Sequence, residues 1–472
     1  MYTSGGKELS KAESLAVVAE LRAENTALKA RIVELETALA RARRNSSNSS
    51  KPPSSDIVKP PPARPASGRR HIGAQPGHTR HERAPFLPDQ VDRHEDHFAS
   101  ECPDCGGPLQ RATEPSVVLQ QAEWVAKPFE VVEHRAWDGH CSKCGRTVYA
   151  TLPPEIEGAG LLGPRMSAHL TWLKIRGHLS YSALREYMAD VVGLSVSRGY
   201  LVKVIRKVAG GLRPVWTELK RALPDQPVVH ADETGHPEAR RRLWTWAFRA
   251  PAFTFFLIVA SRGSKVLERT LGKAFAGILC ADYYSAYRKY MGKCNVLVQF
   301  CLAHFIRDAR FLMGLTDPVT RRYGQKVVAA LRRLFRVIHR REGYASPELF
   351  HRALEDARDR LRRTVLCAPD RIEAQNLAKR FRKHGEAYLR FVTTPGIEPT
   401  NNIVEQALRF VVIDRRLTQG TRSANGRAAR ETLWTVAATC MQQGRSFYRY
   451  LVEAASAHFA QRPVPSLLPT AS

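Results

Sequence analysis

The chain has 472 residues and a formal net charge of +28, from 73 Lys and Arg against 45 Asp and Glu. Its 43% hydrophobic residues suffice for sizeable cores, and the length predicts about three domains. A charge this far from zero favours a polyanionic partner, because phosphate neutralisation is the main source of non-specific affinity for nucleic acid.

The sequence also argues against a membrane or secreted protein. The strongest apolar run, Phe253 to Ala260, is too short to cross a bilayer as a helix. The first 20 residues carry no basic-then-apolar signal pattern. We therefore expect a cytoplasmic protein whose nine cysteines are reduced thiols or metal ligands.

Residues 7–44 carry a heptad repeat of apolar residues. Position d holds Leu21, Leu28 and Leu35, and position a holds Val18, Asn25, Ile32 and Leu39. An Asn at one a position costs stability but fixes the register and favours a parallel dimer. The repeat therefore predicts a leucine-zipper-like coiled coil, which joins two or more copies of the chain or binds a partner coiled coil. The alternative is a lone amphipathic helix packed on its own chain.

Residues 45–97 begin with a Ser- and Pro-rich stretch of basic character, NSSNSSKPPSSDIVKPPPARP. Such a composition cannot bury a core and predicts a disordered, extended linker. The linker either follows DNA phosphates with its Lys and Arg side chains or is an inert solvated spacer.

Residues 98–150 hold two C-x-x-C pairs, each followed by a glycine. The four thiols belong to Cys102, Cys105, Cys141 and Cys144. Two such pairs satisfy one tetrahedral Zn²⁺, whereas a redox-active C-x-x-C does not explain the second pair. The segments 117–125 and 129–137 have the composition of strands. Together they predict a zinc ribbon with one structural Zn²⁺.

Residues 155–215 read as helices with tight turns. One helix ends at Gly193, and the next begins with Ser195 or Ser197 as its N-cap. A helix, a glycine-containing turn and a basic helix are compatible with a helix-turn-helix DNA reader, although many helical hairpins look alike. The side chains that would contact DNA are Arg198, Lys203, Arg206 and Lys207.

Residues 225–435 predict a mixed α/β domain. Strands are expected over 228–232, 241–250 and 253–262, then a helix near 265–275, then strands over 277–282 and 295–301. The strand–strand–strand–helix–strand order is the ribonuclease-H plan. Residues 305–390 read as an Arg-rich helical insertion, most of whose charge is solvated scaffold. A C-terminal helix and tail follow over 436–472.

Three carboxylates fall at informative places in this domain. Asp232 and Asp282 each follow an apolar strand, and Glu405 lies just inside a later helix. Two-metal cleavage of a phosphodiester needs hard oxygen ligands that hold Mg²⁺ or Mn²⁺ ions about 3.5–4 Å apart. The three acids occur in the order that such a site on a ribonuclease-H-like sheet requires. The alternatives within reach are Glu233, Asp308 and Glu398.

The chain resembles transposases of the IS66 insertion-sequence family over nearly its whole length. The resemblance rests on the zipper and C-x-x-C pairs together with KPPSSD, GAQPGH, HADET, RLWTWAF, ADYYSAY, CLAHFIRD, PTNNIVEQALR and SFYRYL. It implies a bacterial protein, associated with the nucleoid when bound to DNA, with Asp232, Asp282 and Glu405 as a DDE catalytic triad. It also implies binding of terminal inverted repeats, two Mg²⁺ per site, strand transfer into target DNA, and small accessory proteins of the same element.

Around this site we expect contacts to double-stranded DNA. The residues concerned are His304, Arg307, Asn401, Asn402, Arg409, Arg415 and Arg416. For His304, a role at the start of a helix is the alternative.

The sequence departs from the family pattern beside the third carboxylate. Gln406 replaces an Arg, the following stretch reads IDRRLTQG, and Tyr283 replaces a small residue. These departures put phosphate contacts near the site in doubt. Two other classes therefore remain open: a DNA-binding regulator, including a catalytically impaired remnant, and a structure-specific nuclease on the same fold.

Overall fold

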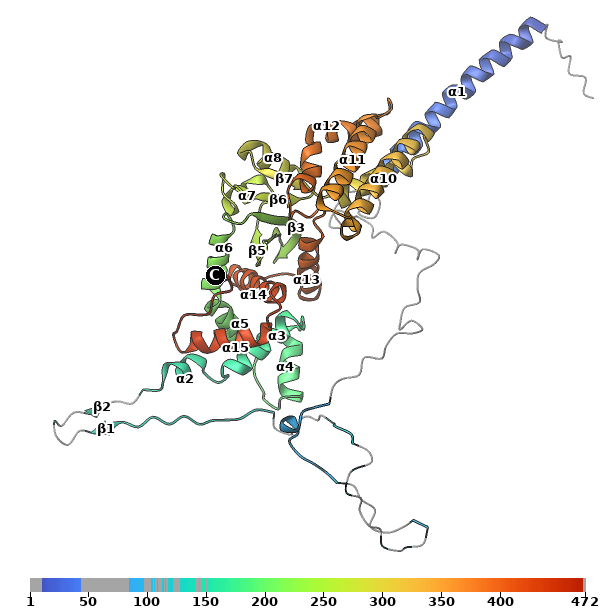
Figure 1. Ribbon diagram of the computed structural model, residues 1–472. Coiled ribbons are helices and arrows are strands. Elements are labelled where there is room, and N and C mark those ends of the chain that lie inside the picture. Colours follow the sequence, from blue (N-terminus) through green and yellow to red (C-terminus); the bar gives the residue numbers. More distant parts are fainter. Residues whose placement is uncertain are drawn as a thin grey trace, which may run out of the picture. The chain divides into compact units, whose positions relative to one another are not determined.

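The computed structural model describes residues 11–43, 85–96 and 151–469, together with short stretches and single residues between 103 and 148 (Figure 1). The chain forms two units, one of residues 61–133 and the other of the remaining residues. No helix in the described ranges is long and apolar enough to cross a membrane.

The heptad segment is one continuous helix, α1 (Lys11–Ala42). Its a and d side chains are exposed, including Leu21, Leu28 and Leu35. The helix is confirmed, and its pairing with a second copy stays a prediction. Most of the 45–97 linker lies outside the described residues. The described part, 85–96, holds a short 3-10 helix, η2 (Pro88–Gln90).

The segment between the C-x-x-C pairs differs from expectation. Residues 130–138 form no strand, although a strand was predicted over 129–137. Two of their apolar side chains are exposed, Val131 to 69% and Trp137 to 79%. A short antiparallel pair instead joins β1 (Gly139–His140) to β2 (Thr147–Val148). Three expected zinc ligands, Cys102, Cys105 and Cys141, lie outside the described residues, and Cys144 is exposed.

Five helices fill the described range from residue 151 to the start of the sheet. They are α2 (Pro154–Ala159), α3 (Pro164–Ile175), α4 (Tyr181–Asp190), α5 (Arg198–Gly211) and α6 (Arg213–Ala222). Of the two candidate caps for α5, Ser197 is the one used: its Oγ accepts the Tyr200 N–H at 3.1 Å. The turn between α4 and α5 passes through Gly193, whose φ of 76° is unstrained only for glycine.

The sheet has five strands in the order β5-β4-β3-β6-β7. They are β3 (Val228–Glu238), β4 (Arg241–Arg249), β5 (Thr254–Val259), β6 (Ile278–Ala281) and β7 (Leu297–Phe300). The first three form an antiparallel meander, and β6 and β7 run parallel to β3. Helix α7 (Ser264–Thr270) precedes β6, and α8 (Ser285–Cys294) precedes β7. All five predicted strands and the intervening helix are confirmed.

The edge strand β5 is covered by α14 (Ala424–Gln442), which lies beside it in Figure 1. Side chains one helical turn apart accept the N–H groups of alternate strand residues. The bonds run from Thr254 N to Thr439 Oγ1 (3.2 Å), from Phe256 N to Thr435 Oγ1 (3.0 Å) and from Ile258 N to Glu431 Oε1 (2.7 Å). These contacts satisfy edge donors that would otherwise be open to pairing. Helix α14 therefore belongs with the sheet, although the core was expected to end at residue 435.

The predicted insertion is helical throughout its length. It contains α9 (Leu302–Met313), α10 (Pro318–His339), η3 (Arg341–Gly343), α11 (Pro347–Leu366) and α12 (Ile372–Thr393). Helix α13 (Asn402–Thr418) then returns to pack on β3 and β4. The last helix, α15 (Phe447–Phe459), packs on α3 and α5. The helices before the sheet thus share a core with the C-terminal helices.

Candidate active site

The sheet places Asp232 and Asp282 on neighbouring parallel strands. His230 of β3 is in register with Cys280 of β6. Asp232 lies two residues further along β3, and Asp282 lies two residues after Cys280, just beyond the end of β6. Neighbouring strands are about 4.8 Å apart, so the two carboxylates project side by side. Both residues are half-buried.

Helix α13 brings Glu405 to the same face. Asn401, which precedes the helix, donates from Nδ2 to the Ala231 carbonyl (2.9 Å), and its Oδ1 lies 3.0 Å from His230 Nδ1. Glu405 is one turn later, in the first turn of α13, and its N–H donates to the Asn401 carbonyl (3.3 Å). The buried amide of Asn401 therefore ties the start of α13 to the strand that carries Asp232.

Burial and neighbouring acids raise the pKa of both aspartates. Burial, followed by the charges of Glu233, Asp282 and Glu405, raises the pKa of Asp232 well above its usual range, although the Glu233 N–H donates to Asp232 Oδ1 at 2.8 Å. Burial and the charge of Glu233 raise the pKa of Asp282 to about 7, opposed by the Tyr284 N–H on its Oδ1. The site therefore holds more negative charge than its own hydrogen bonds can stabilise.

The donor chemistry of this site fits a hard divalent cation. Burial raises the pKa of Glu405, and Arg307 and Arg409 oppose that rise. Its Oε1 is buried without a hydrogen-bond partner. A cation bound by carboxylate oxygens would neutralise the crowded acids and give this oxygen a partner.

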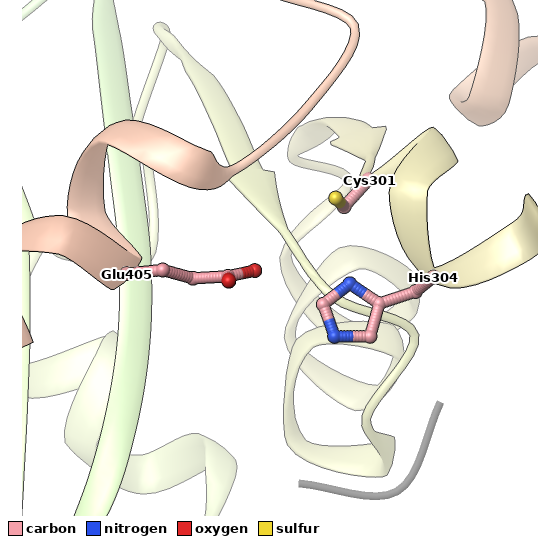
Figure 2. Close-up of side chains that lie close together, drawn as sticks. All are labelled: Cys301, His304 and Glu405. Atoms are coloured by element: carbon pink, nitrogen blue, oxygen red, sulfur yellow. The ribbon is translucent and has the colours of Figure 1, made fainter. Parts of the chain in front are cut away.

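Glu405 also lies in a second, mixed group of donors. Among the described residues, ligand atoms of Cys301, His304 and Glu405 all lie within 4.8 Å of one another (Figure 2). Burial lowers the pKa of His304 to about 4, so its imidazole is neutral at neutral pH. Cys301 was not singled out from the sequence, although the C-x-x-H spacing in CLAHFIRD was a readable signal.

Two of the three alternative acids form ion pairs in the structure. Glu233 accepts from Arg262 Nε (2.7 Å) and from the Tyr287 hydroxyl. Asp308 accepts from Arg380 (2.7 Å). Glu398 is exposed. The network of Glu233 was also missed by sequence reasoning, because its partners come from distant segments.

The residues expected to contact DNA fall into two groups. Six are exposed: Arg198, Lys203, Arg206, Asn402, Arg409 and Arg416. Others are engaged within the chain. The ammonium of Lys207 donates to the Gly158 carbonyl and lies 5.0 Å from the centre of the Phe459 ring. Arg415 donates to Thr234 Oγ1 (3.1 Å).

Asn401 requires a correction. It is 2% exposed, and both ends of its amide are used by β3. Its role in the fold is to position α13, and its side chain is not at a DNA-facing surface. Arg307 is half-buried near Glu405. His304 lies in the first turn of α9, with its Nδ1 buried and unpaired.

The positions where the sequence departs from the family pattern, namely Gln406, the stretch IDRRLTQG and Tyr283, have local surroundings that suit these residues. Gln406 is exposed. Gln419 ends α13 in the left-handed region, and Gly420 follows with a φ of 84°. A Cβ on Gly420 would lie 2.0 Å from the Pro237 carbonyl oxygen, so only glycine fits there. Tyr283 packs edge-on against Phe300, with ring centres 5.2 Å apart.

Comparisons with known proteins agree with the geometry. The sequence model of a family described as "Transposase IS66 family" matches residues 159–429. A second model, of a family of unknown function (DUF6444), matches residues 5–84. The uncharacterized protein y4jD of Sinorhizobium fredii is 25% identical over 401 residues, which are 78% of this chain and 77% of that protein. The uncharacterized protein y4hP of the same organism is 22% identical over 376 residues, covering 72% and 67%.

Proposed function

The chain belongs to the IS66 family of transposases, and we propose that it cleaves the ends of its element and joins them to target DNA at a DDE site formed by Asp232, Asp282 and Glu405. The observation that carries this proposal is the register of β3 and β6. It sets two aspartates side by side, and α13 presents a glutamate to the same face. The strand order β5-β4-β3-β6-β7 supports a ribonuclease-H-like core.

The three carboxylates would hold two Mg²⁺ or Mn²⁺ ions. Two such ions supply activation of the attacking oxygen and stabilisation of the leaving oxygen. The crowding that raises the pKa of Asp232 and Asp282 supports this assignment, because bound cations would neutralise acids that stand close together.

The reaction has two in-line displacements at phosphorus. Water attacks the phosphodiester at the element end and frees a 3′-hydroxyl. That hydroxyl attacks a target phosphodiester at the same site, which joins the element strand to the target 5′-phosphate and releases the target 3′-oxygen as a hydroxyl. The chain's contribution is to orient the reacting groups and to neutralise charge. Arg307 and Arg409 are near enough to Glu405 to act on its pKa, and they would attract the DNA phosphates.

Other parts of the chain would hold the DNA ends. We propose that α1 pairs two copies through Leu21, Leu28 and Leu35, which are exposed. The exposed basic residues of α5 would contact the inverted repeats, and the four cysteines would bind a structural Zn²⁺. Small accessory proteins of the same element would act with it.

The test is cleavage of a labelled duplex that carries an element end, with Mg²⁺ or with a chelator. The proposal predicts metal-dependent release of a 3′-hydroxyl, followed by joining to a plasmid. Binding without metal-dependent cleavage would instead identify a regulator or an impaired remnant. Cleavage without joining would identify a nuclease. Glu398→Gln is the control, since it removes an exposed acid of the segment before α13.

A further inference from the structure

A donor group of mixed chemistry lies where β7, α9 and α13 meet. Cys301 caps the start of α9, and His304 is in the first turn of that helix. Glu405 approaches from the first turn of α13. Figure 2 shows the thiol, the imidazole and the carboxylate directed toward a common space. Their ligand atoms lie within 4.8 Å of one another.

One atom in each of two of these side chains lacks a hydrogen-bond partner. His304 Nδ1 and Glu405 Oε1 are both buried from solvent and make no hydrogen bond. A buried polar atom without a partner destabilises the fold, so two of them facing one space call for a ligand. A proton shared between them would satisfy both, and so would a metal ion.

The backbone holds this group in place before any ligand arrives. The Cys301 N–H donates to the Ala281 carbonyl (2.8 Å), which fixes the cysteine beside the strand end that carries Asp282. The Leu302 N–H donates to the Pro399 carbonyl (2.9 Å). The Asn401 N–H points at Cys301 Sγ (3.2 Å). Two of these bonds join the start of α9 to the segment that leads into α13, and the third joins it to the end of β6.

The donor set selects the kind of ion. One sulfur, one imidazole nitrogen and one carboxylate oxygen suit Zn²⁺ and similar borderline ions, whereas Mg²⁺ takes oxygen ligands. Tetrahedral Zn²⁺ with bonds of about 2.0–2.3 Å keeps its ligand atoms about 3.5 Å apart. Small side-chain rotations would bring the three donors to that spacing. Three protein ligands leave a fourth position open.

We propose that Cys301, His304 and Glu405 bind a zinc-class ion, which competes with the catalytic Mg²⁺ for Glu405 and so inhibits strand transfer. The inhibition rests on the proposed function of Glu405, whereas the binding does not. Coordination by Cys301 requires its thiolate, so its proton leaves to solvent when the ion binds. The two ions compete when the Glu405 carboxylate turns toward Cys301 and His304 and away from the aspartates.

The binding test uses the full chain and equilibrium dialysis against ZnCl₂, followed by metal analysis. The wild type is expected to hold more zinc than Cys301→Ser, beyond whatever the four-cysteine segment takes in both proteins. Loss of one ligand should weaken this zinc by more than about 100-fold. His304→Gln should behave like Cys301→Ser, and it keeps the test valid if the serine variant fails to fold. Cys280→Ser is the matched control, because Cys280 is equally buried and belongs to no such donor group within the described part of the chain.

The competition test adds MgCl₂ to the same dialysis. Mg²⁺ should weaken zinc binding in the wild type, and zinc should inhibit strand transfer by the wild type more than by Cys301→Ser. Equal zinc content in the wild type and in both variants would overturn the site. Zinc binding that is insensitive to Mg²⁺ would overturn the claim that both ions use the Glu405 carboxylate. Zinc binding by a protein that joins no DNA would leave this site standing and remove the proposed function instead.

Discussion

Replacing Asp282 by Asn should stabilise the metal-free protein at alkaline pH. The pKa of Asp282 is raised from 3.8 to about 7, because the carboxylate is buried beside other acids. Because the pKa of Asp282 is higher in the folded than in the unfolded state, the free energy of unfolding falls as the pH rises from one pKa to the other. The loss begins as pH rises above about 4 and is complete above about 7. Asn carries no charge and avoids the loss, and it keeps the oxygen that accepts the Tyr284 N–H.

The size of the effect follows from the pKa. Each tenfold change in the acid dissociation constant is about 1.4 kcal/mol, so a rise from 3.8 to about 7 corresponds to about 4 kcal/mol. Asp282 is half-buried, and solvent screening reduces the figure, so we expect about 2 kcal/mol. Well below pH 3.8 the carboxyl is neutral in both states, and the variant should match the wild type.

The assay is urea unfolding with chelator present, followed by tryptophan fluorescence, at pH 4.5 and pH 8. Asp282→Asn should be the more stable protein at pH 8, and the difference should shrink toward pH 4.5. Glu398→Gln, which removes an exposed acid, should change little at either pH. Adding Mg²⁺ should stabilise the wild type through preferential binding to the folded state and should affect Asp282→Asn less. If Asp282→Asn is no more stable than the wild type at pH 8, the argument that burial and neighbouring acids destabilise ionised Asp282 is refuted.

Two further predictions concern the scaffold around the site. Gly420→Ala should destabilise the protein by more than about 2 kcal/mol, because its Cβ would clash with Pro237. Gly396→Ala, at a similar positive φ with open space around it, should cost only about 1 kcal/mol; equal unfolding midpoints for the two variants would argue against the clash. Thr435→Val should cost about 1–3 kcal/mol by leaving the Phe256 N–H unpaired. Unchanged hydrogen exchange at Phe256 would contradict that role.

The strands of the core were predictable because each carries a short apolar run between polar turns. The runs that end at Asp232 and Asp282 gave both the elements and the two aspartates. The heptad repeat likewise predicted the helix at α1. The order of these strands and helices along the chain could be predicted from the order of the apolar runs in the sequence.

Features that depend on contacts between segments far apart in the sequence were harder to predict. A strand was expected over 129–137 from its composition, and residues 130–138 form none. The composition of a segment does not provide the partner strand that a sheet requires. Asn401 looked like a surface residue at a helix start, but its amide is consumed by β3. The pairing of Glu233 with Arg262 joins segments that the sequence does not connect. Cys301 could be recognised as a possible metal ligand only from the structure, which brings Glu405 close to it although the two are far apart in the sequence.

The most direct test of the central claim is strand transfer by wild type and Asp232→Asn at equal DNA occupancy. The substrate is a pre-cleaved element end with a free 3′-hydroxyl, supplied with Mg²⁺ and a target plasmid. The wild type should join the end to the plasmid, and Asp232→Asn should bind the end equally well and join none. Mg²⁺-dependent joining by Asp232→Asn at the wild-type rate would contradict the assignment of the site.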